Sequence, residues 1–131
     1  MFQILNTDGA RRLYAAARDL PIIDFHNHIS VADIASDRKY ANLSEIWLAP
    51  DPYKHRLMRI CGVPETFITG SATPREKFQK FCEIFPYTAG NPTFDWSRAE
   101  LKEIFGIDAL PSKETADRIF DQATELLASP E

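Results

Sequence analysis

Two histidines, His26 and His28, have the spacing of a metal-binding pair. They stand at i and i+2 directly after the apolar residues 21–25, and such positions of a β-strand point to the same side. Neutral imidazole binds divalent ions well. Asp24 lies on the same predicted face and can orient one histidine or complete the site. Because a catalytic ion usually has three protein ligands and an open position, the pair predicts part of a metal site. The alternative is a pair of surface histidines.

A second group of candidate residues, Tyr53, Arg56 and Arg59, is spaced for one face of a predicted helix. Arginine binds carboxylates through two parallel hydrogen bonds, so two guanidinium groups and a phenol suit a sugar that carries a carboxylate. The alternative is a solvated basic helix without a ligand. His55 lies between charged residues, and we expect it at the surface.

Caps, prolines and apolar spacing predict a mainly helical chain with one short strand at residues 21–25. Helices are expected near residues 8–19, 31–36, 42–48, 52–61, 73–85, 96–105 and 112–128. The clearest begins at Thr73, where an N-cap, a proline and the capping-box residue Glu76 occur together. Its apolar face comprises Phe78, Phe81, Cys82 and Phe85. Cys82 is therefore expected to be a buried thiol, and two cysteines make no disulfide framework.

A single strand cannot form a sheet, because its backbone hydrogen-bonding groups would have no partners. Residues 22–25 therefore require strands that this sequence does not contain. This requirement indicates a truncated or partnered chain. The strand edge and the uncovered apolar surface favour self-association or contact with the missing remainder.

The composition is that of an ordinary water-soluble domain. The 131 residues carry a net charge of -4, which argues against nucleic acid, since phosphate binding needs a basic face. No run approaches the ~20 apolar residues of a membrane span. Residues 1–12 lack the apolar stretch of a signal peptide, so the expected location is the cytoplasm.

Residues 21–28, which read Pro-Ile-Ile-Asp-Phe-His-Asn-His, are similar to the first strand of the amidohydrolase superfamily. Later segments, in the same order along almost the whole chain, resemble uronate (glucuronate) isomerase. These segments are Asn42-Leu43, Ile46-Trp47-Leu48, Asp51, Tyr53-Lys54, Arg56, Met58-Arg59, Gly62-Val63, Ile68-Thr69-Gly70, Glu76-Lys77-Phe78, Gly90-Asn91-Pro92, Trp96, Glu100-Leu101 and Phe105-Gly106-Ile107. The ordered set is far more specific than the histidine pair.

The resemblance implies a parent fold that is a distorted (β/α)8 TIM barrel. Residues 1–30 would supply an N-terminal helix and the first barrel strand, and residues 31–131 a helical insertion region. It also implies the aldose–ketose isomerisations of D-glucuronate to D-fructuronate and of D-galacturonate to D-tagaturonate. A TIM barrel needs about 250 residues, so the remainder is absent and this chain alone is expected to be inactive.

The same resemblance makes His26 and His28 ligands of a divalent metal, with zinc the expected ion. It places Tyr53 at the uronate substrate as a candidate catalytic residue, for proton handling or for contact with a sugar hydroxyl. One departure stands out, because the family commonly has a histidine where this chain has Pro52. That replacement removes a possible acid or base beside Tyr53. Two other functions are considered: a self-standing helical interaction module, and another metal-dependent amidohydrolase activity. The ordered segments weigh against the latter.

Overall fold

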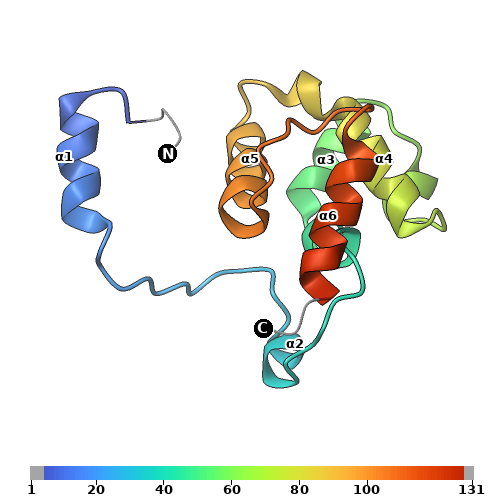
Figure 1. Ribbon diagram of the computed structural model, residues 1–131, viewed down its shortest axis with the longest axis horizontal. Helices are drawn as coiled ribbons and strands as arrows, with labels where there is room; N and C mark the ends of the chain where they lie inside the picture. The colour runs from blue at the N-terminus through green and yellow to red at the C-terminus, as the bar shows by residue number, and fades with distance from the viewer. Residues whose placement is uncertain (1–4, 129–131) are drawn as a thin grey trace.

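The computed structural model describes residues 5–128 and is helical throughout its ordered elements (Figure 1). These are α1 (Asp8–Ala17), α2 (Val31–Ala35), the π-helical turn η1 (Ser44–Leu48), α3 (Pro52–Ile60), the 3-10 turn η2 (Glu65–Phe67), α4 (Pro74–Ile84), the 3-10 turn η3 (Phe85–Thr88), α5 (Pro92–Phe105) and α6 (Ala116–Ala128). Among the described residues, no helix is both long enough and apolar enough to cross a membrane.

Helix α4 lies at the centre of the helical body and contacts α3, α6, η1, η2 and η3. The four apolar residues predicted for its core face are all buried, including Cys82, and burial raises the pKa of the Cys82 thiol. A buried thiol with a raised pKa is chemically inert. The prediction of a structural cysteine is therefore confirmed.

Aromatic side chains connect the elements of this body. The rings of Trp47 and Phe81 meet edge to face at 5.4 Å between centroids, and Phe81 lies 5.7 Å from Phe85. Phe78 lies 5.6 Å from Phe120 of α6. Aromatic pairs prefer such tilted arrangements and contribute beyond the area they bury. The aromatic contacts thus hold η1, η3 and α6 against α4.

The predicted capping box at the start of α4 is present. The Thr73 backbone N–H donates to Glu76 Oε2 at 2.8 Å, and the Glu76 N–H donates to Thr73 Oγ1 at 3.3 Å. Arg75 then joins α4 to α6, donating to Asp117 at 2.9 Å and to Asp121. Local sequence therefore fixes both the start of α4 and its pairing with α6.

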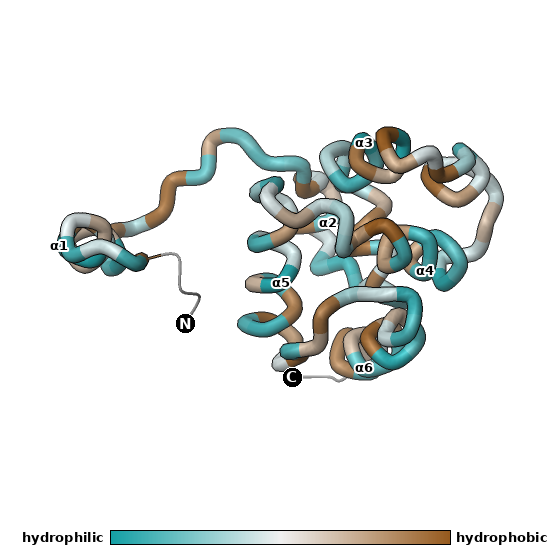
Figure 2. Tube along the Cα trace, turned by 90° about the horizontal axis from the view of Figure 1, so that it is seen from above, coloured by the Kyte–Doolittle hydropathy of each residue, from teal (hydrophilic) through white to brown (hydrophobic). Residues whose placement is uncertain are grey.

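The N-terminal arm, residues 5–29, projects from the helical body as α1 and an extended segment (Figure 1). None of the residues of α1 is buried. The apolar side chains of Ile22, Ile23 and Phe25 are 92%, 85% and 96% exposed, and the apolar stretch of the arm is visible in Figure 2. A contiguous exposed apolar stretch of this kind is typical of a surface that contacts another segment or chain.

The strand expected at residues 21–25 does not form in this chain. The segment is extended but has no strand assignment, and no strand occurs among the described residues 5–128. The physical reason is the one that sequence analysis identified, since a strand needs a neighbouring strand to accept and donate its backbone hydrogen bonds. The helical part of the predicted fold is confirmed.

Three helix predictions need correction. Helix α5 begins at Pro92 instead of residue 96, because the Asn91 side chain accepts the Thr93 N–H at 2.9 Å and caps it. Helix α6 begins at Ala116, because Ser112 caps a separate turn through residue 115. The segment expected as an ordinary helix at residues 42–48 forms a π-helical turn.

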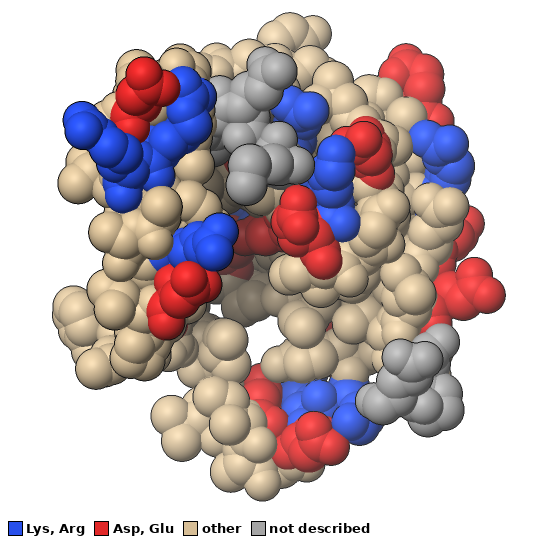
Figure 3. All heavy atoms as spheres, turned by 60° about the vertical axis from the view of Figure 1, so that its left-hand side comes forward, with Lys and Arg blue, Asp and Glu red and all other residues tan. Residues whose placement is uncertain are grey.

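Charged side chains are dispersed over the face shown in Figure 3, where Lys and Arg alternate with Asp and Glu instead of gathering in a basic patch. Ion pairs along the chain include those of Arg11 with Asp8 and of Lys102 with Asp108. This face therefore lacks the electrostatic character of a nucleic-acid-binding surface.

Candidate functional site

The two histidines lie at the end of the arm, where it meets the helical body. Two side chains hold the backbone there: Asp24 Oδ1 accepts the His26 N–H at 3.2 Å, and Asn27 Oδ1 accepts the Ile29 N–H at 2.9 Å. The imidazole centroids of His26 and His28 lie 5.6 Å apart, with the rings inclined by 64°. The structure therefore brings the predicted pair together.

Tyr53 approaches the histidine pair from α3. Its ring is stacked on the His28 ring, with centroids 6.0 Å apart and planes inclined by 11°. Its position follows from the start of α3, where Asp51 is the N-cap and Pro52 the first helical residue. Asp51 Oδ1 accepts the Tyr53 N–H at 2.8 Å. The end of the arm and the start of α3, which are separate in the sequence, are therefore in contact through the rings of His28 and Tyr53.

A cavity of about 1090 Å³ opens beside these rings. His26, His28 and Tyr53 line it, together with residues of α2 and η1 and with Glu100 from α5. The cavity therefore lies between the end of the arm and the helical body, and α5 closes one side. Its size is that of a small-molecule site.

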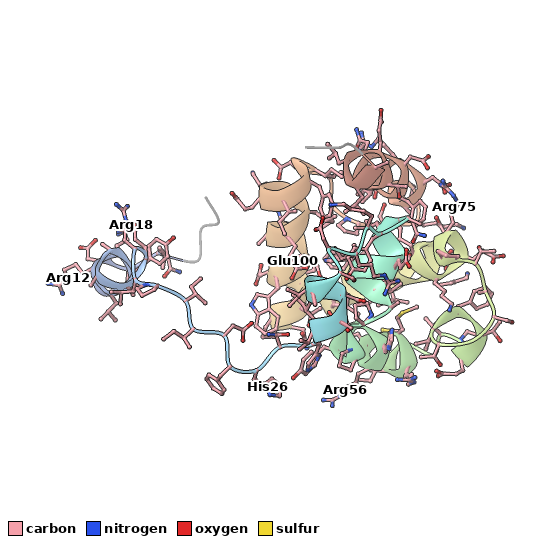
Figure 4. The ribbon with its side chains drawn as sticks, turned by 90° about the horizontal axis from the view of Figure 1, so that it is seen from below. Arg12, Arg18, His26, Arg56, Arg75 and Glu100 are labelled. Atoms are coloured by element: carbon pink, nitrogen blue, oxygen red, sulfur yellow. The ribbon has the colours of Figure 1, made fainter. Side chains whose placement is uncertain are left out.

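Arg56 and Arg59 lie outside this cavity. Arg56 is exposed and points away from the body (Figure 4). Arg59 donates to both oxygens of Glu65, at 2.6 and 2.9 Å, and this pairing, with a hydrogen bond from Thr69, lowers the Glu65 pKa to about 2. Helical spacing correctly put the two arginines on α3 but did not reveal that Glu65 engages one of them.

Three cavity-lining side chains were missed as functional candidates: Trp47, Lys54 and Glu100. Lys54 is only 4% exposed, although lysine is almost never buried without a partner. Its ammonium lies 2.6 Å from Asp51 Oδ2 and 3.7 Å from Glu100 Oε2. The i, i+3 spacing of Asp51 and Lys54 is a local signal, but Glu100 has no sequence signal because it comes from a different helix.

The residues present fit a divalent metal only in part. The histidine pair supplies two imidazoles in the same region, which suits zinc and similar ions. No group of three or more potential ligands occurs within residues 5–128, and Asp24 is engaged with its own backbone turn. The histidine pair alone is therefore fewer than the three protein ligands that are usual for a catalytic zinc ion.

His55 is half-buried instead of lying at the surface as predicted, and its Nε2 atom is buried without a hydrogen-bond partner. Burial lowers the pKa of His55, and the charge of Arg59 acts in the same direction. A backbone hydrogen bond to Leu48 and the charges of Asp51 and Glu65 act in the opposite direction but do not prevail. The folded chain therefore favours neutral His55.

The thermal stability of the chain is expected to decrease as the pH is lowered from about 8 to about 5.5, in part through His55. With a lowered pKa in the folded state, His55 binds fewer protons there than in the unfolded chain, whose histidine titrates near pH 6.5. Stability is thus fully present above about pH 6.5 and is lost as the pH falls below it. Melting temperatures of the chain and of His55→Gln across this range test the prediction. An identical pH slope in both proteins would contradict it.

The sequence profile of the glucuronate isomerase family matches residues 2–131. The chain belongs to this family. It is 48% identical to a uronate isomerase of Shouchella clausii over 130 residues, which cover 99% of the chain and 28% of that relative. A uronate isomerase of Marinomonas sp. is 45% identical over 98% of the chain and 28% of its own length. The glucuronate isomerase family is therefore established by both the profile and the relatives.

Solved structures agree with the family assignment. A uronate isomerase from Thermotoga maritima matches with a TM-score of 0.83 and 39% identity over 88% of the chain and 26% of that structure. A glucuronate isomerase from Caulobacter crescentus matches with a TM-score of 0.82 and 30% identity, over 91% of the chain and 26% of its own. The chain thus spans about 28% of the length of the curated family members it matches, at their N-terminal portion.

Proposed function

We propose that this chain is the part of a cytoplasmic uronate isomerase that contributes two metal ligands and one substrate contact. The full-length enzyme would interconvert D-glucuronate with D-fructuronate, and D-galacturonate with D-tagaturonate. The observation that carries the proposal is the stack of Tyr53 on His28 beside His26 at one cavity. Membership of the glucuronate isomerase family supports it.

The reaction moves a proton from C2 to C1 of the sugar and a second proton between the two oxygens, through an enediol. A general base at C2 typically contributes 10²–10⁴-fold. His26 and His28 would hold a divalent ion, with zinc the expected one, and this ion would stabilise the developing negative charge when bound. Tyr53, which stacks on His28, would contact the sugar hydroxyls. The base and the third ligand come from the remainder of the enzyme.

The proposed architecture assigns residues 1–30 to an N-terminal helix and the first strand of a distorted TIM barrel. Residues 31–131 form the helical region inserted after that strand. The exposed apolar side chains of Ile22, Ile23 and Phe25 support this division, because barrel strands are buried on both faces. In the isolated chain the same surface favours self-association.

Carboxylate binding by the arginines of α3 requires a change in their surroundings. Arg59 would exchange Glu65 for the substrate carboxylate, and Arg56 would be covered by a part of the enzyme outside this chain. Substrate binding within the chain therefore centres on Tyr53, with Arg56 and Arg59 as further contacts when the barrel closes over α3.

The alternative is a self-standing helical interaction module. The observation that favours it is that the core elements lie within residues 43–123, so the body does not depend on the arm for its packing. A module of this kind would use the exposed arm to bind a partner and would perform no chemistry.

A ketose-formation assay separates the two functions. The full-length enzyme is expected to convert D-glucuronate and D-galacturonate when supplied with zinc, and the 131-residue chain alone to show no turnover, because it provides only two ligands. Turnover by the isolated chain, or a full-length enzyme that is inactive on both uronates with every divalent ion tried, would contradict the proposed function.

A further inference from the structure

Lys54 is a buried cation that links three elements around the cavity. Its ammonium binds Asp51 Oδ2 at 2.6 Å, lies 3.7 Å from Glu100 of α5 and lies 4.4 Å above the centre of the Trp47 ring of η1. The Trp47 indole N–H donates to the same oxygen of Glu100. Lys54, Asp51, Glu100 and Trp47, which we call the Lys54 cluster, all line the cavity.

Asp51 connects the Lys54 cluster to the position of Tyr53. One carboxylate oxygen caps α3 by accepting the N–H groups of Tyr53 and Lys54, at 2.8 and 3.1 Å, while the other binds the Lys54 ammonium. Partial burial acts to raise the pKa of Asp51, but the Lys54 ammonium and the backbone N–H groups of Tyr53 and Lys54 together lower it. The cap is therefore a fixed carboxylate, held from both sides.

Pro52 adds stiffness at the same point. It is the first residue of α3, between the cap and Tyr53, and its ring fixes the backbone angle φ. Tyr53 thus follows a capped, proline-fixed turn, and the turn is attached through Lys54 to α5 and η1. The orientation of the Tyr53 ring, which stacks on His28, would therefore depend on the contacts of Lys54 with α5 and η1.

We propose that Lys54 is a positioning residue of the site, which holds the start of α3, and with it Tyr53, against Glu100 and Trp47. Without the ammonium, the Asp51 and Glu100 carboxylates would share a partly buried space with no cation between them. Like charges in such surroundings repel. Asp51 then moves toward solvent, the cap loosens and Tyr53 leaves the His28 ring.

The catalytic consequence of this positioning role rests on the proposed function of Tyr53. Displacing a substrate-contacting group by about 1 Å can cost on the order of 10²-fold in rate. Lys54→Met in the full-length enzyme is therefore expected to lower kcat about tenfold to a hundredfold, with a smaller change in KM. Zinc content is expected to stay at the wild-type level, because Lys54 is not a ligand.

The structural consequence is measured without any activity. Histidine ring proton resonances of this chain report the stack, and Tyr53→Leu gives the position of the His28 resonances without it. Lys54→Met is expected to move them in the same direction as Tyr53→Leu. Glu100→Gln, which keeps an acceptor for Trp47 but removes one charge, is a milder variant that is expected to move them less and to keep the fold.

Lys80→Met is the matched control, since Lys80 forms an i, i+3 ion pair with Glu83 on α4, outside the cavity. It is expected to leave the His28 resonances and kcat unchanged. Unmoved His28 resonances in both Lys54→Met and Glu100→Gln would overturn the proposal, even if their melting temperatures fall. If the His28 resonances move but kcat does not change, Lys54 positions Tyr53 as proposed, and the proposed contact of Tyr53 with the substrate is contradicted instead.

Discussion

Replacing His28 by alanine in the full-length enzyme is expected to reduce both bound zinc and uronate isomerisation by at least about a hundredfold. Mutating a residue that only supports a metal ligand already costs 10–100-fold in affinity or activity, so loss of a ligand itself costs at least as much. His28 also stacks on Tyr53, so its loss would remove a proposed ligand and a neighbour of the proposed substrate contact together. Metal content by mass spectrometry and the rate of ketose formation measure the two effects.

His55→Gln is the control for this variant, because His55 does not line the cavity. It is expected to retain zinc and activity at neutral pH. A His28→Ala enzyme with wild-type metal content and rate would show that the histidine pair is not a metal site. A loss of activity with full metal content would instead assign His28 to substrate positioning through Tyr53.

Sequence analysis identified those residues of the candidate site that lie close together in the sequence. His26 and His28 are two residues apart, and a strand or an extended segment places such side chains on the same side. Helical spacing made Tyr53 a candidate sugar contact, the resemblance to uronate isomerase implied the same position, and its stack on His28 appears only in the structure. Lys54 was quoted as part of that resemblance without a role of its own.

The Lys54 cluster shows why the rest of the site was beyond sequence analysis. Its members come from η1, α3 and α5, and packing of these elements decides that Glu100 faces Lys54. Nothing in the spacing of Glu100 on α5 indicates such a partner. A buried lysine is also unexpected from composition, since its desolvation is acceptable only with partners that the fold provides.

The fold was predictable to the extent that helix ends carry their own signals. Thr73 marked a helix start that the structure reproduces, and the helix ends predicted near residues 61 and 105 lie beside Gly62 and Gly106, whose backbones are left-handed. Residues 21–25 carried an equally clear strand signal, yet a strand forms only when a second segment pairs with its backbone N–H and C=O groups. The apolar, β-branched residues that predict a strand lie exposed here, and no second segment pairs with them among the described residues 5–128.

The helical body, unlike the arm, is expected to depend on single buried side chains. Phe81→Ala should lower the free energy of unfolding by about 3–5 kcal/mol, the usual cost of emptying a buried phenylalanine site. Phe81 is fully buried and contacts both Trp47 and Phe85. Removing its ring would therefore leave an empty space in the core between α4, η1 and η3. Urea unfolding followed by circular dichroism measures the loss.

Tyr87→Ala provides the comparison for Phe81→Ala, because Tyr87 is an aromatic residue of η3 that is 81% exposed. It is expected to change the free energy of unfolding by about 0.5 kcal/mol or less. Equal effects of the two variants would contradict the packing described for α4. Trp47 lines the cavity and rests on Phe81, so the core that Phe81→Ala would weaken also supports one wall of the candidate site.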